Sequence, residues 1–166
     1  MLGQDNPLFD INNITMKEFK DINDILDFAI NEEQKAIDFY NILAEKSTND
    51  DVKTVFIDFV KEEMNHKARL EKIKAEKQFT IEDKVIADLK IADYLVSVKI
   101  TSDMKYEDAL VIAMKKEKAA FKLYMDLAEK APNAKMKSVF ISLAQEESKH
   151  KLKFEIEYDE FVMREN

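Results

Sequence analysis

The two histidines of this 166-residue chain carry the clearest chemical signal in its sequence. Each follows a glutamate by three residues, and a further glutamate stands thirty residues before each of these pairs. Residues three apart lie on one face of a helix, so each pair can direct a carboxylate and an imidazole toward the same point. Both groups are ligands of iron, manganese and zinc. The pattern therefore predicts a metal site built from Glu33, Glu63, His66, Glu117, Glu147 and His150.

All six residues interrupt helical seams, the rows of residues spaced three and four apart along each helix, which are otherwise apolar. In the first seam, Glu33 stands between Ala29 and Ala36, which belong to a series with steps of three and four residues. Burying four carboxylates costs several kcal/mol per unpaired ion, and no Lys or Arg occupies a seam position. Two divalent cations would cancel the four charges. One Glu from each of two helices, with Glu-x-x-His from each of the other two, is the pattern of di-iron and di-manganese carboxylate bundles.

An internal duplication supplies the helices that would position these side chains. Residues 29–71 align with 113–155 at a constant offset of 84, and the aligned residues include both Glu-x-x-His pairs; Glu32, however, aligns with Lys116. The apolar period predicts an all-α fold, a four-helix bundle made of two helical hairpins. We expect the chain to form one domain, 1–166, with an irregular tail at 1–14. The predicted helices span 19–46, 51–77, 104–130 and 134–162, with a long crossover at 78–103.

Local signals refine these boundaries. Asn49 and Asn133 stand where helix N-caps belong, and a capping box at Thr15–Glu18 predicts an early start for the first helix. The crossover is fairly apolar, so we expect it to pack on the bundle or against a second subunit, with a short helix of its own.

Tyr40 and Tyr124 follow Glu33 and Glu117 by two helical turns. They could be core aromatic residues whose hydroxyls find any partner. We favour a supporting role, in which each hydroxyl bonds a ligand carboxylate of the other half of the molecule. For the histidine motifs, the alternative is two surface Glu-x-x-His pairs that only support their helices, but that alternative leaves the seam positions unexplained.

At this level of detail the chain resembles the rubrerythrin branch of the ferritin-like superfamily. The resemblance is carried by two segments, AEKSTNDDVKTVFIDFVKEEMNHKARLE and AEKAPNAKMKSVFISLAQEESKHKLKFE. It implies a ferritin-like bundle that binds two iron ions through the six residues named above, with manganese or zinc as substitutes. Two departures matter. The chain has no cysteine for a rubredoxin-like iron domain, and Met114 stands where rubrerythrins have an extra carboxylate linked to peroxide reduction.

Three functions compete at this stage. The first is a di-iron oxidoreductase that reduces peroxide or O₂ and oxidises Fe(II), for which a separate donor, rubredoxin-like or other, would supply electrons. The second is an iron or other divalent-metal binding or storage protein with a single ferroxidase-like turnover. The third is a partner-binding bundle without metal, which the seam carboxylates disfavour. By analogy with the family we expect a homodimer or a higher homo-oligomer.

Composition excludes other classes. One glycine and two prolines disfavour barrels, sandwiches and Gly-rich phosphate loops, and the absence of cysteine excludes disulfides and thiolate metal sites. A net charge of −8 argues against nucleic acid or an anionic membrane as a partner. Residues 1–14 show no signal-peptide pattern, so we expect a cytoplasmic location.

Overall fold

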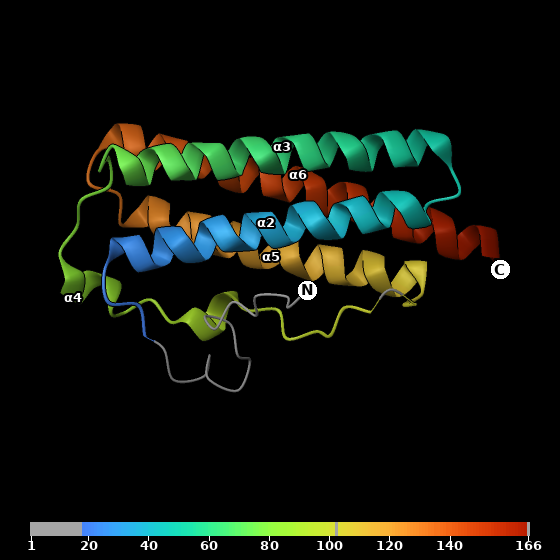
Figure 1. Ribbon diagram of the computed structural model, residues 1–166, viewed down its shortest axis with the longest axis horizontal. Coiled ribbons are helices and arrows are strands. Elements are labelled where there is room, and N and C mark those ends of the chain that lie inside the picture. The colour runs from blue at the N-terminus through green and yellow to red at the C-terminus, as the bar shows by residue number, and fades with distance from the viewer. Residues whose placement is uncertain (1–17, 102, 166) are drawn as a thin grey trace, which may run out of the picture.

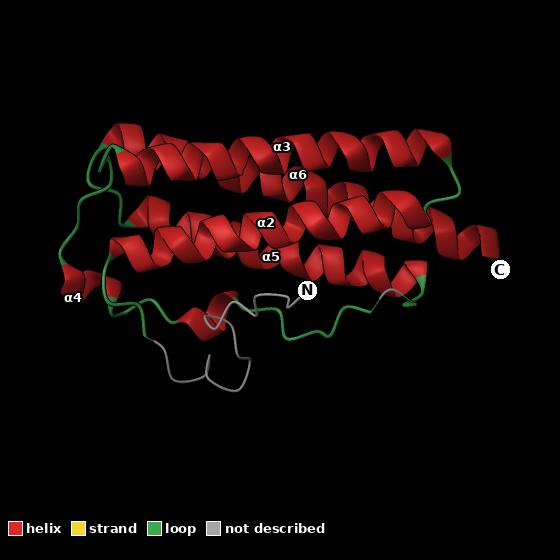
Figure 2. Ribbon diagram, viewed as in Figure 1, coloured by secondary structure: helices red, strands yellow, loops and turns green. Residues whose placement is uncertain are grey.

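Four long helices form a bundle, in which they lie side by side (Figure 1). The computed structural model describes residues 18–101 and 103–165, and its regular structure in these ranges is entirely helical (Figure 2). The long helices are α2 (Ile22–Lys46), α3 (Asp50–Ala75), α5 (Tyr106–Glu129) and α6 (Ala134–Glu165). The prediction of an all-α four-helix bundle is therefore confirmed. The expected irregular tail, 1–14, and Thr15 of the expected capping box lie outside the described residues.

The helix ends follow local hydrogen bonding. Asn49 caps α3 by accepting from the backbone amides of Asp51 and Val52, and Asn133 accepts from that of Met136 at 2.9 Å. Helix α2 begins at Ile22, three residues later than the seam predicts, because the Asp21 carboxylate accepts from the Asp24 amide and caps the helix there. Residues 18–20, the described residues directly before this cap, are not helical.

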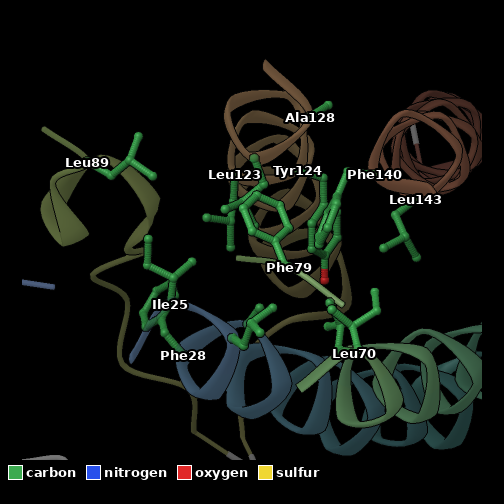
Figure 3. Close-up of a cluster of buried hydrophobic side chains, with 14 of the residues drawn as sticks. Ile25, Phe28, Leu70, Phe79, Leu89, Leu123, Tyr124, Ala128, Phe140 and Leu143 are labelled. Carbon is green, nitrogen blue, oxygen red and sulfur yellow. The ribbon is translucent and has the colours of Figure 1, made fainter. Parts of the chain in front are cut away.

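The two hairpins are joined by a crossover that runs along the length of the bundle (Figure 1). It contains the short helix α4 (Asp83–Ile86) and the 3₁₀ turn η1 (Ile91–Tyr94). Ile86, Leu89 and Tyr94 are buried in one apolar cluster with side chains of the long helices, and Figure 3 shows Leu89 as one of its members. Of the two expected positions for the crossover, the structure shows packing on the bundle of its own chain.

Apolar packing divides into two clusters on either side of a polar layer. One cluster includes Leu70, Tyr124 and Phe140, with the crossover residues (Figure 3). The other includes Tyr40 and Phe154 with residues from the opposite halves of the helices. Helix α2 packs most extensively on α3, and α5 on α6. The bundle is thus stabilised by burial at both ends, which leaves its middle to hold charged side chains.

The end of α6 extends past its predicted limit at residue 162. The Tyr106 hydroxyl donates to Glu157 at 3.0 Å, Arg164 donates to the same carboxylate at 3.3 Å, and the Phe161 ring meets that of Tyr106 edge-on. These contacts tie the last turns of α6 to the start of α5. Within the part of the chain that is described, no helix combines the length and apolarity needed to cross a membrane.

Candidate metal centre

The six residues predicted from the sequence come together in the polar layer at mid-bundle. Helices α2 and α5 each contribute one glutamate, and α3 and α6 each contribute a Glu-x-x-His pair. Each of the six side chains belongs to a residue that is at most 3% exposed. The seam positions are what bring them inward, because every helix turns the same apolar face toward the bundle axis.

The histidines direct their Nδ1 atoms into the carboxylate cluster. His66 Nδ1 lies 2.8 Å from Glu147 Oε1, 3.2 Å from Glu63 Oε2 and 3.8 Å from Glu33 Oε1. His150 Nδ1 lies 2.7 Å from Glu63 Oε1 and 3.5 Å from Glu117 Oε1. The two rings are nearly parallel, with centroids 6.2 Å apart. The two halves of the duplication therefore place equivalent donor atoms on two sides of one cluster.

These donors form two overlapping groups. In each group one ligand atom from each of four residues lies within 4.8 Å of the others. Glu63 and Glu147 belong to both groups, Glu33 and His66 to the first, and Glu117 and His150 to the second. Because a carboxylate has two oxygens, the two shared glutamates would be available to both ions of a pair, while each of the other residues would be available to one.

Each tyrosine supports a glutamate from the other half of the molecule. The Tyr40 hydroxyl on α2 donates to Glu117 Oε1 on α5, and the Tyr124 hydroxyl on α5 donates to Glu33 Oε1 on α2. Both tyrosines are at most 1% exposed. Their hydroxyls hold the two non-shared carboxylates in place, and their rings belong to the apolar clusters above and below.

The outer nitrogen of each histidine bonds a glutamate of the opposite helix. His66 Nε2 on α3 contacts Glu146 on α6, and His150 Nε2 on α6 contacts Glu62 Oε2 on α3 at 2.6 Å. A ring that donates Nε2–H in this way presents Nδ1 to the site and is fixed in orientation. Glu62 and Glu146 are not among the six site residues predicted from the sequence. Both residues stand directly before a predicted ligand, at equivalent positions of the repeat, and this placement could have identified them from the sequence.

Without metal, burial and the neighbouring groups favour protons on several of these side chains. Burial and the neighbouring carboxylates raise the pKa of Glu33 and of Glu147 well above the usual range. For Glu63, burial favours the neutral form, but hydrogen bonds from Glu33, His150 and His66 together hold its pKa well below the usual value. Burial opposes charge on the histidines too, yet their carboxylate neighbours raise the pKa of His66 and bring that of His150 to about 11. A cation entering this cluster must therefore displace protons.

The donor set fits a pair of divalent cations. Four carboxylates and two imidazole nitrogens converge, and the ion-pair partners of these carboxylates among the described residues are the two histidines. One buried oxygen, Glu117 Oε2, finds no hydrogen-bond partner in the described part of the chain. A buried carboxylate oxygen without a partner is costly, and a cation at the site would satisfy it.

A comparison with protein families agrees with this arrangement. The family model named Rubrerythrin matches residues 24–158, which include all four long helices for most of their length. The chain belongs to the rubrerythrin family. A search of curated proteins finds no match to this rubrerythrin-family chain.

A solved structure shares the fold of this rubrerythrin-family chain. It belongs to a protein from Thermotoga maritima described as a ferritin-like diiron-carboxylate protein. The match has a TM-score of 0.70 and 22% sequence identity, and it covers 87% of this chain and 98% of the other. The ferritin-like fold expected from the sequence is therefore confirmed.

Met114 marks where the site departs from what the family resemblance implies. Its side chain is half-buried and packs against the apolar cluster that contains Tyr40 and Phe154. It supplies no oxygen to the site. The donor set of this rubrerythrin-family protein is thus symmetric, with the same residue types contributed by each half.

Replacing Glu146 with glutamine is expected to weaken metal binding by roughly 10–100-fold, the range typical of a residue that orients a metal ligand. The amide at position 146 is a weaker acceptor for His66 Nε2–H and leaves the imidazole less basic. Glu62→Gln should have a smaller effect, because the Glu62 side chain is 52% exposed whereas that of Glu146 is 34% exposed. Titration with Co²⁺ gives the affinity, and the cobalt absorption bands report the orientation of the imidazole.

Glu71→Gln is the matched control for these two variants, since Glu71 is exposed on α3. It should bind cobalt as the unmodified chain does. Wild-type affinity and spectrum in both Glu146→Gln and Glu62→Gln would contradict an orienting role.

Proposed function

We propose that this protein is a non-haem di-iron carboxylate protein that reduces hydrogen peroxide or O₂ while oxidising Fe(II). The observation that carries the proposal is the pair of overlapping four-donor groups that share Glu63 and Glu147. Family membership and the likeness to a protein described as diiron-carboxylate support iron as the metal. Glu33, Glu63, His66, Glu117, Glu147 and His150 would hold the two ions.

A bound ferrous pair would supply the two electrons that turn hydrogen peroxide and two protons into two water molecules, leaving a ferric pair. The residues of the chain provide the setting for that reaction. Glu63 and Glu147 would balance charge on both ions at once. The imidazoles, held by Glu62 and Glu146, would keep their Nδ1 lone pairs directed at the site.

The surroundings restrict water. Phe59 stacks on the His150 ring with centroids 4.1 Å apart, and the two apolar clusters close the site along the bundle axis. Tyr40 and Tyr124 each occupy one oxygen of a non-shared glutamate. These contacts hold the carboxylates in a defined geometry, and a low-dielectric environment strengthens their interactions with cations.

Anaerobic titration with Fe(II), followed by addition of peroxide, tests the proposal. We expect binding to saturate at about two ions per chain, the number that the two donor groups would hold. Stoichiometric oxidation should then appear in the absorption spectrum, and added reductant should sustain peroxide consumption. Saturation at one ion, or no oxidation after loading, would contradict the proposal.

A second candidate is an iron or other divalent-metal binding or storage protein with a single ferroxidase-like turnover. Met114 favours it, because the extra carboxylate that the resemblance links to peroxide reduction is replaced by an apolar side chain that packs in the core. The same titration separates the two functions. Oxidation once per loading, followed by iron retention despite added reductant, would support this candidate.

Steady catalysis needs electrons from elsewhere. The chain has no cysteine, so it cannot hold a rubredoxin-like iron centre of its own. We therefore propose a separate electron donor, rubredoxin-like or other, and a homodimer or a higher homo-oligomer as the assembly. Size measurement in solution and reduction assays with added donor proteins test these two proposals. A cytoplasmic location stays a prediction.

A further inference from the structure

A cavity of about 30 Å³ lies between α2 and α5, and its lining extends from the four site carboxylates to half-buried residues near the surface. Its inner wall contains all four carboxylates of the site and the two supporting tyrosines, which are buried. Its outer wall contains the half-buried residues Glu32, Val96, Lys116 and Ala119. The lining thus passes from the polar centre of the bundle to residues in contact with solvent.

Small side chains create this opening. Ala36 on α2 and Ala120 on α5 occupy equivalent positions of the repeat, and both line the cavity. Helices α2 and α5 contact each other less extensively than either contacts its hairpin partner; α3 and α6 contact each other less still, but there the histidine side chains fill the space. The crossover covers the opening with Tyr94 and Val96, while Phe28 and Leu123, seen in Figure 3, form apolar walls.

The opposite face of the site is closed. There the histidine rings fill the space between α3 and α6, and the carboxylates of Glu62 and Glu146 bond their outer nitrogens. Of α3 and α6, the cavity touches only Glu63 and Glu147. A molecule approaching the centre through this cavity therefore arrives between α2 and α5, on the side of the tyrosines.

Lys116 lies across the outer end of the cavity. It belongs to α5, but its Nζ atom lies 5.9 Å from the centroid of the Phe39 ring on α2. The equivalent residue of the other half, Glu32, lines the same cavity from α2. The repeat is symmetric at the six site residues, yet it places opposite charges at this opening, and the long lysine side chain narrows it.

We propose that this cavity is the access route to the metal centre for molecules of two or three heavy atoms, and that Lys116 excludes larger ones. A space of about 30 Å³ admits roughly two water-sized molecules, and two bound ions would take part of it. Hydrogen peroxide, O₂ and azide fit this limit, whereas alkyl hydroperoxides do not. The inference rests on the proposed function, because it assumes that two ions are bound.

Azide binding to the Co²⁺-loaded protein tests the route. In Ala120→Leu the larger side chain fills the cavity, and we expect azide to bind about tenfold or more slowly, with unchanged cobalt content. Ala68→Leu is the matched control, since Ala68 is exposed on α3 and does not line the cavity. If Ala120→Leu does not fold, Ala119→Leu replaces it in this experiment, because Ala119 also lines the cavity.

The role of Lys116 is tested with the Fe(II)-loaded protein and two oxidants. Lys116→Ala should raise the rate of oxidation by tert-butyl hydroperoxide, relative to hydrogen peroxide, by about tenfold. The control is Lys118→Ala, which changes an exposed lysine on the same helix. An unchanged ratio in Lys116→Ala would overturn its selective role.

Failure of the route and failure of the proposed function give different results. Wild-type azide binding in a folded Ala120→Leu or Ala119→Leu chain that holds two cobalt ions would overturn the route alone. A wild-type chain that binds fewer than two cobalt ions would overturn the proposed function and the route that depends on it.

Discussion

Glu63→Ala is expected to remove most of the bound metal, because Glu63 belongs to both donor groups. The loss in affinity should exceed the roughly 10–100-fold change typical of residues that only orient a ligand. His150→Ala removes a donor of one group, so about one ion per chain should remain. Elemental analysis after equilibration with Mn²⁺ or Fe²⁺ measures both values.

The helices should survive both substitutions, since the two apolar clusters on either side of the polar layer stay intact. Circular dichroism checks this point. Glu71→Ala, at an exposed position of α3, is the control and should keep the full metal content. Unchanged metal content in both Glu63→Ala and His150→Ala would contradict the ligand assignment.

Much of the fold follows from the seam. Steps of three and four residues place Glu33 and Ala36 on the same face of α2, and the duplication repeats that face in α5. The start of α2 was harder to predict, because both the Thr15–Glu18 box and Asp21 are competent caps. The packing of Phe19 on Phe28, with ring centroids 5.6 Å apart, favours the later one. Such a contact depends on the tertiary structure and leaves no periodic signal.

The site shows the same division between local and tertiary information. Spacing alone places Glu63 and His66 on one face of a helix. It does not tell which ring nitrogen of His66 turns inward, or that Glu146 of the other hairpin bonds the outer one. That pairing depends on how closely α3 and α6 approach, and the centroids of the two imidazoles are 6.2 Å apart. Sharing of Glu63 and Glu147 between two groups likewise depends on the packing of all four helices.

Loading the protein with metal is expected to raise its melting temperature strongly. Two sites, each held at 100 times its dissociation constant, stabilise the folded chain by about 5 kcal/mol, which corresponds to roughly 10–20 °C for a chain of this length. The ions would stabilise the folded chain because they balance the charges of the four buried carboxylates. Calorimetry with Mn²⁺ or with a chelator measures the difference.

The difference in melting temperature between the metal-loaded and the metal-free protein should widen as the pH rises from about 6 to 9. In the metal-free protein the histidine pKa values are raised, that of His150 to about 11, so their stabilising contribution is complete below the unfolded pKa of about 6.5 and declines above it. The raised pKa values of Glu33 and Glu147 act in the same direction. The stability that they contribute begins to be lost as the pH rises above about 4.5. The lowered pKa of Glu63 contributes a constant amount in this range, since its stabilisation is lost only at acidic pH.

The affinity for metal should rise with pH, because the ions displace the protons held by Glu33, Glu147 and the two histidines. Higher pH therefore weakens the metal-free protein and strengthens binding at the same time. His150→Ala should reduce the pH dependence, because it removes one of the protonated groups. Equal melting temperatures with metal and with chelator, or a difference that narrows toward pH 9, would contradict a metal centre built from these six side chains.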